Sequence, residues 1–373
     1  VNRAEATVTA DGKTKVYGDA DPELTATAAG LVNNDAASVL SYTISRTDGE
    51  NAGDYAITPS GAAVQGNYSV TFENGTLAIT PFEIEITAND ATKTYGEALS
   101  FDGTEFTVTP ATLPNGESIA TVSIASAEAA DAATAAGEYA DAIAAGPDVT
   151  GIDAANYSIT FHPGKLTVAK PGLTVKAKDR TKTYGNTLTF PGLPNEIEVE
   201  GVASGERVVR ATLSSAKAAA AATAAGEYEN EIEVSGAVVS NLVTGATFDA
   251  GENYSVAYVK GKLTVGRRAL EITAHDQEKT YGEAKSFAGL SCVTLNPATL
   301  PNGEAITSIV LPSAKAADPA TAAGEYENAV GDGEAAIGGI DTANYAITLV
   351  PGKLTVNRAE ATVTADGKTK VYG

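Results

Sequence analysis

The chain is built from an internal repeat, and such a period constrains the fold more strongly than any single segment does. A Val/Thr-Tyr-Gly tripeptide recurs, with its tyrosine at Tyr17, Tyr95, Tyr184, Tyr281 and Tyr372. An Ala-Gly-Asp/Glu-Tyr element ends at Tyr55, Tyr139, Tyr228 and Tyr326, and an Asn-Tyr element carries Tyr68, Tyr157, Tyr254 and Tyr345. These three positions hold 13 of the 15 tyrosines, which favours packing in the core or between strands over a sugar-binding platform.

The repeat positions divide the chain into four domains. We predict domains at residues 1–81, 82–170, 171–267 and 268–357, with residues 358–373 as the first strand of a following repeat. Residues 356–373 copy residues 1–18 without a change, so we expect the natural protein to repeat a unit of 355 residues. Two residues separate the last strand of domain 1 from the first strand of domain 2, which predicts little freedom between domains.

Within each domain the hydrophobic pattern is that of β-strands. In the segment FEIEITA, Phe82, Ile84 and Ile86 alternate with glutamate and threonine. Near the end of the domain, Pro163-Gly164 separates two alternating runs and predicts a hairpin. We therefore predict an all-β chain of four tandem small antiparallel domains joined end to end into an elongated rod. An Ig-like sandwich is the favoured arrangement, and a β-grasp-like domain with one helix is the alternative.

Alanine-rich stretches interrupt domains two to four and end at Tyr139, Tyr228 and Tyr326. Alanine is the best helix former, but Pro319 cannot lie inside a helix. Asp318 as N-cap, Pro319 as the first helical residue and Gly324 past the end would suit a single turn. We expect one turn of helix or a loop in this stretch.

Composition excludes several classes of function. Asp and Glu number 47 against 25 Lys and Arg, and the net charge of -22 argues against nucleic acid or an anionic membrane as partner. The single Cys292 excludes an intrachain disulfide. The chain has no Met, no leader and no apolar run near 18 residues, so we expect no signal peptide or membrane span, and an internal piece of a longer protein.

Candidate catalytic and metal-binding residues are scarce. The only histidines, His162 and His275, follow strand segments and are expected at the surface. No nucleophile, base or cofactor motif is present, which predicts that the chain is not an enzyme and holds no cofactor or metal. The acidic excess favours a solvated surface. Calcium bound at the junctions between domains is the alternative interpretation.

A lysine, an acid and an asparagine recur together in every repeat and suggest a cross-link. A buried lysine of lowered pKa can attack the side-chain amide of asparagine and form a new amide bond with release of ammonia, when a nearby carboxylic acid shuttles protons. The simpler interpretation places the lysine in a turn and the asparagine at a strand start, where its side chain satisfies backbone groups. The triples are Lys15, Asp54 and Asn67; Lys93, Glu138 and Asn156; Lys182, Glu227 and Asn253; and Lys279, Glu325 and Asn344.

The order of motifs resembles a known family. A first strand of LEITA type, then D-x-x-KTYG, AGEY and a closing NYSITF segment are similar to the YGX-type MBG repeats of large bacterial cell-surface, adhesin-like proteins. The resemblance implies an extracellular location and a structural stalk that projects a functional tip, with neighbouring repeats as the main partners. It brings no catalytic residues.

Two further possibilities stay open at this point. The domains could instead be tandem modules that bind a host protein or glycan through exposed loops. The shared PATLPNGE segment, at residues 110–117 and 297–304, is the best candidate for such a loop. Residues 358–373 could also pair as a strand with another chain.

Overall fold

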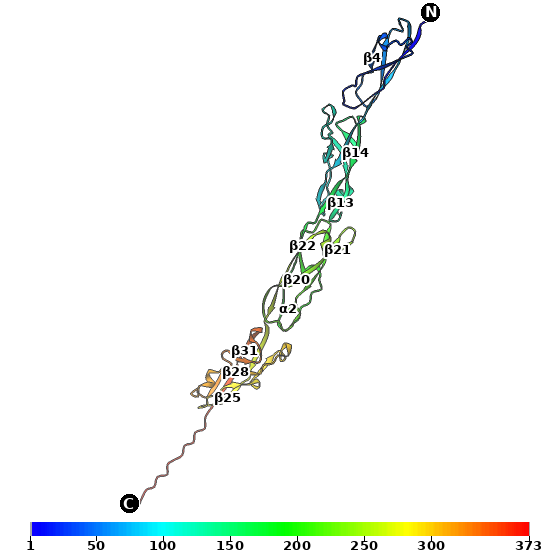
Figure 1. The fold of residues 1–373 in the computed structure, drawn as a ribbon. Helices are drawn as coiled ribbons and strands as arrows, with labels where there is room; N and C mark the ends of the chain where they lie inside the picture. Colours follow the sequence, from blue (N-terminus) through cyan, green and yellow to red (C-terminus); the bar gives the residue numbers. More distant parts are fainter. Residues whose placement is uncertain (1, 373) are drawn as a thin grey trace. The chain divides into compact units, whose positions relative to one another are not determined.

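The computed structural model describes residues 2–372, and strands predominate in every repeat (Figure 1). The chain forms two compact units. The first reaches to Pro171 and includes Glu252–Tyr254, and the second holds Gly172–Gly251 and the residues from Ser255 onward. Each unit therefore contains two consecutive repeats, apart from the short segment that groups with the first unit.

Repeat 1 shows the plan that the others follow, with two sheets. Sheet 1 has the order β3-β1-β7-β6, and sheet 2 has the order β2-β8-β5-β4. The first strand is antiparallel to β3 and parallel to β7, and β2 is parallel to β8. The elements are β1 (Ala4–Ala10), β2 (Lys13–Val16), β3 (Ala26–Ala29), η1 (Ala37–Val39), β4 (Tyr42–Arg46), β5 (Gly53–Gly61), β6 (Val64–Gln65), β7 (Tyr68–Glu73) and β8 (Gly75–Thr80).

Repeat 2 keeps both sheets, with the orders β11-β9-β14 and β10-β15-β13-β12. Its elements are β9 (Phe82–Ala88), β10 (Ala91–Thr94), β11 (Phe106–Thr109), η2 (Pro114–Gly116), β12 (Thr121–Ala125), α1 (Ala127–Ala130), β13 (Gly137–Thr150), η3 (Ala154–Asn156), β14 (Tyr157–His162) and β15 (Gly164–Ala169).

Repeat 3 has the orders β18-β16-β22 and β17-β23-β20-β19, with β21 paired to β20. Its elements are β16 (Gly172–Ala177), β17 (Arg180–Thr183), η4 (Pro194–Glu196), β18 (Ile197–Glu200), β19 (Glu206–Ser214), α2 (Ala216–Ala219), β20 (Gly226–Asn241), β21 (Thr247–Asp249), α3 (Ala250–Asn253), β22 (Ser255–Val259) and β23 (Gly261–Gly266).

Repeat 4 divides into the orders β27-β24-β31, β25-β32-β29 and β26-β28-β30. Its elements are β24 (Arg268–Ala274), β25 (Gln277–Thr280), β26 (Phe287–Ala288), η5 (Leu290–Cys292), β27 (Val293–Asn296), η6 (Pro301–Gly303), β28 (Ser308–Leu311), α4 (Ala314–Ala317), β29 (Gly324–Val330), β30 (Ala336–Gly338), η7 (Thr342–Asn344), β31 (Tyr345–Val350) and β32 (Gly352–Asn357).

The predicted all-β class and tandem domains are confirmed. In β9 the inward residues Ile84, Ile86 and Ala88 are buried and alternate with more exposed neighbours, as the pattern indicated. Within the described residues no α-helix exceeds four residues, so nothing corresponds to the long helix of a β-grasp domain. The pairing is mixed rather than purely antiparallel, because the first and second strands of every repeat pair in parallel with its last two.

The predicted hairpin at Pro163-Gly164 is wrong. β14 pairs in parallel with β9 in one sheet, and β15 pairs in parallel with β10 in the other, so the chain continues forward and changes sheet. The glycine is required by close approach, because a Cβ on Gly164 would lie 2.6 Å from the carbonyl oxygen of Ala88. A glycine that admits a neighbouring backbone has the same sequence signature as one in a tight turn.

The alanine-rich stretches do form single helical turns, α1, α2 and α4. The expected position in repeat 4 is wrong, because the turn begins after Ser313 as N-cap and Asp318 stands at its end. The hydroxyl of Ser313 accepts a hydrogen bond from the backbone N–H of Ala316, which is the usual role of an N-cap serine. Pro319 therefore follows the helix instead of opening it.

Residues 358–372 repeat the sequence of β1 and β2 but form no strand, and Val363 and Val371 are exposed. In repeat 1 the same sequence pairs with β3, β7 and β8, which lie further along that repeat. Because the local sequence is the same in both places, the strands of repeat 1 form through pairing with these partners and not through local sequence alone.

Candidate functional site at the junctions between repeats

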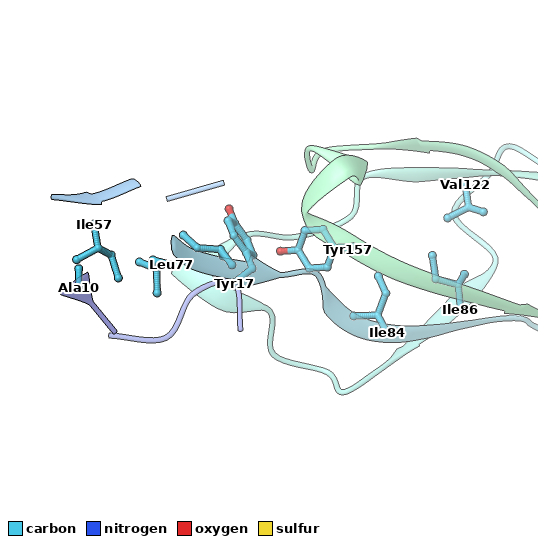
Figure 2. Close-up of a cluster of buried hydrophobic side chains, with 9 residues drawn as sticks. Ala10, Tyr17, Ile57, Leu77, Ile84, Ile86, Val122 and Tyr157 are labelled. Atoms are coloured by element: carbon cyan, nitrogen blue, oxygen red, sulfur yellow. The ribbon is translucent and has the colours of Figure 1, made fainter. Parts of the chain in front are cut away.

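The first unit brings two of the tyrosine motifs together where repeat 1 meets repeat 2 (Figure 2). Tyr17 follows β2 of repeat 1, and Tyr157 opens β14 of repeat 2. Their rings meet edge to face, with 5.6 Å between centroids and an interplanar angle of 69°. Glu117 lies between their hydroxyls. Tyr17 donates to Oε1 of Glu117 at 2.6 Å, and Tyr157 donates to Oε2.

The two tyrosines are buried and belong to a core that both repeats share, while Glu117 is partly exposed. Ile57 and Leu77 from repeat 1 pack in the same cluster as Ile84 from repeat 2, together with the two tyrosines. The hydrogen bond to Glu117 and burial raise the pKa of Tyr17. Burial and then Glu117 raise the pKa of Tyr157 strongly. Both effects keep the phenols protonated, so each acts as a hydrogen-bond donor to the carboxylate.

The third motif supplies a second connection at the same junction. The side-chain oxygen of the buried Asn156 accepts a hydrogen bond of 2.8 Å from the backbone N–H of Ala52 in repeat 1, the alanine of the Ala-Gly-Asp-Tyr element. Asn156 also donates to the side chain of Asn51 at 3.2 Å. The hydroxyl of Tyr55 donates to the carbonyl of Asn51 and so fixes the loop that presents Ala52.

The glycine of the Val/Thr-Tyr-Gly tripeptide lies against the next repeat. Gly18 has φ of +88°, in the region that favours glycine, and a Cβ there would lie 2.3 Å from Cβ of Pro114. Pro114 opens the η2 turn, in which Asn115 (φ 56°) and Gly116 (φ 73°) place Glu117 beneath the tyrosines. The glycine is therefore required both for its backbone conformation and for the contact.

The second unit repeats this arrangement between repeats 3 and 4. Tyr184 and Tyr345 both donate to Glu304, and their rings lie 5.6 Å apart. The backbone N–H of Ala225 donates to Asn344 at 2.7 Å. A Cβ on Gly185 would lie 2.4 Å from Cβ of Pro301, and Arg268 donates to the carbonyl of Tyr184. We call this set of contacts, the acid with its two tyrosines and the asparagine with its alanine N–H, the junction clamp.

Parts of the same pattern recur inside the first unit, which includes Glu252–Tyr254. The rings of Tyr95 and Tyr254 lie 5.5 Å apart at 80°. The backbone N–H of Ala136 donates to the side chain of Asn253 at 3.0 Å. Thus Asn253 bonds to the alanine of repeat 2 just as Asn156 bonds to that of repeat 1.

The recurring lysines are buried on the second strand of each repeat, not in a turn. In repeat 3, Lys182 donates to the carbonyls of Lys217, Ala218 and Ala220 and so satisfies the end of α2. Lys93 and Lys279 do the same for α1 and α4. Burial lowers the pKa of Lys93 and of Lys182.

Repeat 1 lacks the alanine-rich insertion and its α-helical turn, and Lys15 binds carboxylates instead. Its ammonium lies 2.7 Å from Asp21 and 2.6 Å from Glu50, and Arg46 contacts the same two acids. Desolvation lowers the pKa of Lys15, but the hydrogen bonds and charges of Asp21 and Glu50 outweigh it, so the pKa lies above its usual value. The alanine-rich insertion thus replaces two carboxylates with backbone carbonyls as acceptors for the lysine.

The structure does not bring the members of the cross-link triples together. The asparagines Asn156, Asn253 and Asn344 bond to backbone N–H groups of a preceding repeat, while the lysines bond to the groups just described. The acids Glu138, Glu227 and Glu325 are exposed and pair with Lys165, Lys262 and Lys353. In repeat 1, Asp54 and Asn67 are exposed. The geometry gives no support to the cross-link.

The PATLPNGE segment is an exposed loop in part, with Ala111, Thr112 and Asn115 exposed, but three of its residues serve the junction. Its Leu113 packs against the shared core, its Pro114 contacts Gly18, and its Glu117 binds the tyrosines. The octapeptide is identical in repeats 2 and 4 and was a visible signal, but sequence alone left open whether it faced solvent or a neighbouring repeat.

The remaining candidate residues lie at the surface. His162 and His275 are exposed, and His275 bonds to Thr294 and to the carbonyl of Ser291. In residues 2–372, no three His, Cys, Asp or Glu side chains are grouped so that they could hold a metal ion. Among the described residues, no helix has both the length and the apolar character needed to cross a membrane.

Comparison with known proteins agrees with the repeat pattern. The MBG domain of the YGX type matches residues 6–78, 84–167, 173–264 and 270–355. No curated protein matches the chain. Among solved structures, the crystal structure of Drosophila N-cadherin EC1-4 aligns with a TM-score of 0.17 and 8% identity over 82% of this chain and 83% of that one, which carries no argument about the fold. On the family match, the chain belongs to the MBG domain family of the YGX type and carries four such domains in tandem.

Proposed function

We propose that the chain is a stalk segment of an extracellular bacterial cell-surface protein and holds a functional tip away from the cell. One observation carries the proposal: the three motifs that recur in every repeat are used to fix consecutive repeats to one another. Tyr17, Asn156 and Tyr157 all serve the junction clamp. A chain whose recurring residues join repeats is suited to transmitting position and force along its length.

Two further features support the stalk. The core that repeats 1 and 2 share opposes hinge motion, because bending would expose apolar side chains to water. The net charge of -22 would keep a long array soluble and separate from its neighbours. We infer no catalytic role for the chain. For the alternative, tandem modules that bind a host protein or glycan, the best candidate loop has three residues in the junction and the others exposed.

Small-angle X-ray scattering of the chain, with and without calcium, tests the proposal. Four domains of about 35 Å each would give a maximum dimension on the order of 140 Å. We expect this dimension in both conditions, because the carboxylate of each clamp already accepts two hydroxyl hydrogen bonds. A compact particle would contradict the stalk, and extension only with calcium would show that a cation completes the junctions.

A further inference from the structure

Repeat 4 ends in half of a junction clamp. Its tripeptide tyrosine, Tyr281, is 48% exposed, whereas Tyr17, Tyr95 and Tyr184 are 3–5% exposed. A Cβ on Gly282 (φ +95°) would meet no atom within 4 Å, whereas one on Gly18 or Gly185 would meet a proline. The surface made by Tyr281 and Gly282 therefore has the conformation of the other junctions without the contact.

Repeat 4 also carries the alanine loop that would form the second connection of the clamp, the bond from an alanine N–H to an asparagine. Tyr326 donates to the carbonyl of Ala322, as Tyr55 does to Asn51, and so fixes the loop of the Ala-Gly-Glu-Tyr element. The next residue, Ala323, is exposed, whereas Ala52 and Ala225 are partly covered at their junctions. Its backbone N–H is the counterpart of the groups that donate to Asn156 and Asn344.

Repeat 1 carries the complementary half. The run Leu31-Val32-Asn33-Asn34-Asp35 aligns with Leu113-Pro114-Asn115-Gly116-Glu117. Asn33 (φ 61°) and Asn34 (φ 64°) adopt the same left-handed conformation as Asn115 (φ 56°) and Gly116 (φ 73°), although non-glycine residues rarely do so. The hydroxyl of the buried Tyr68 donates to Oδ2 of Asp35 at 2.8 Å, as Tyr157 does to Glu117.

The face around Asp35 is open to a partner. Asn67 is exposed, whereas its counterparts Asn156, Asn253 and Asn344 are buried. Val32, which occupies the position of Pro114, is 46% exposed. A hollow on this face is lined by residues that include Arg3, Val32, Asn33, Val64, Gly66 and Asn67.

The sequence indicates what covers each half. Residues 356–373 are identical to residues 1–18, so the segment that follows repeat 4 has the sequence of repeat 1. We propose that the end of repeat 4, at Tyr281, Gly282 and Ala323, is the docking surface for the Asp35, Asn67 and Tyr68 face of a second copy of repeat 1. Successive copies of the 355-residue sequence are then joined by a junction clamp in which aspartate replaces glutamate. The inference rests on the proposed stalk, since a continuous stalk needs a joint between one copy and the next.

The test extends the full chain by residues 19–81, placed directly after Gly373, so that the copied segment is completed to a whole repeat. Nitration by tetranitromethane, read by mass spectrometry, then reports the accessibility of each tyrosine. Tyr281 should react in the 373-residue chain and become as resistant as Tyr17 and Tyr184 in the extended chain. Unchanged reactivity of Tyr281, in an extended chain whose appended copy of Tyr68 is protected and hence folded, would overturn the proposal.

Asp35 occurs twice in the extended chain and provides a matched control. Asp35→Ala in the appended repeat should restore nitration of Tyr281, while the same substitution in the first repeat should leave Tyr281 protected. Protection of Tyr281 that survives the change in the appended repeat would overturn the assignment of the acid. Small-angle scattering tests the stalk independently of this interface. If the lengthened chain is compact while Tyr281 is protected, the stalk is contradicted and the interface is retained.

Discussion

At the scale of single residues, the junction depends on one carboxylate that accepts two phenol hydrogen bonds from different repeats. Glu117 joins Tyr17 to Tyr157, and Glu304 joins Tyr184 to Tyr345. Hydrogen bonds to a charged acceptor are stronger than neutral ones, and phenols left unpaired in a buried site are costly. The geometry makes the acid the central group of the clamp.

Glu117→Ala should loosen the first junction without unfolding the repeats. We expect a loss of about 2 kcal/mol, which corresponds to about thirtyfold faster exchange through junction opening. The measurement is hydrogen exchange of the Ala52 amide, which donates to Asn156 across the junction. The amide of Ala225, at the corresponding junction of the second unit, is the control and should not change. Equal exchange at Ala52 in both proteins would contradict the role of Glu117.

The raised pKa values of Tyr17 and Tyr157 predict a sensitivity to alkali. The folded state holds these protons more tightly than the unfolded state, so the stabilisation is complete below the ordinary tyrosine pKa of 10.0 and is lost as the pH rises above it. Unfolding of the first unit, followed by denaturant titration at several pH values, should show this decline. Tyr157→Phe removes one of the two protons, so its decline should be shallower; an identical decline would contradict the prediction.

Sequence reasoning at this scale found the right residues but only part of their roles. It identified the three tyrosine positions as framework residues, because they recur at fixed places. It did not identify Glu117, because an acid in a polar loop is normally solvated, and its two partners lie 40 and 100 residues away in the chain. It proposed a cross-link for Lys93 and Asn156, but Lys93 bonds to backbone carbonyls, and Asn156 bonds to the backbone of Ala52 and the side chain of Asn51.

At the scale of elements, each alanine-rich insertion forms one helical turn that is anchored at both ends. Ser215 caps the start of α2, and Lys182 satisfies three carbonyls at its end. A four-residue helix is too short to be stable alone, so these contacts account for its presence. A single helical turn was predictable from the alanine content and from the proline and glycine near it. The anchoring role of Lys182 was not, because this lysine lies 34 residues earlier on another strand.

Lys182→Met should release this turn. The substitution keeps the apolar stem but removes the donors of three hydrogen bonds, which should cost about 2 kcal/mol. Hydrogen exchange of the Ala220 amide, which donates to Ala216 within the turn, reports the loss. Lys217→Met is the matched control on the same helix, because Lys217 forms an exposed ion pair with Glu231 and should cost at most about 1 kcal/mol. Equal effects of the two substitutions would contradict the anchoring role.

Strand existence and strand pairing differ in how far they follow from sequence. The alternation in β9 and its counterparts gave the strands correctly. The pairing of β14 and β15 did not follow, because Gly164 is needed for approach to the backbone of Ala88 and not for a chain reversal. Local signals therefore give the elements, while long-range contacts decide which sheet each strand enters.

At the scale of the whole molecule, the two repeats of each compact unit are joined by the same residues that define the repeat. The junction of repeats 1 and 2 has a shared core, an acid with two tyrosines, and an asparagine bonded to a backbone N–H. Such a joint opposes both bending and twisting, because either motion breaks directional hydrogen bonds and exposes apolar surface. We therefore expect the two repeats of each unit to be rigidly joined.

The most direct test is the distance distribution between spin labels on either side of the first junction. Labels at the exposed positions Thr58 in β5 and Thr160 in β14, in a Cys292→Ala background, report the relative placement of repeats 1 and 2 by pulsed electron double resonance. We predict a single narrow distribution in this protein and a broad one when Glu117→Ala is added. A broad distribution with Glu117 intact would contradict the account, because the two repeats would then move independently despite the clamp.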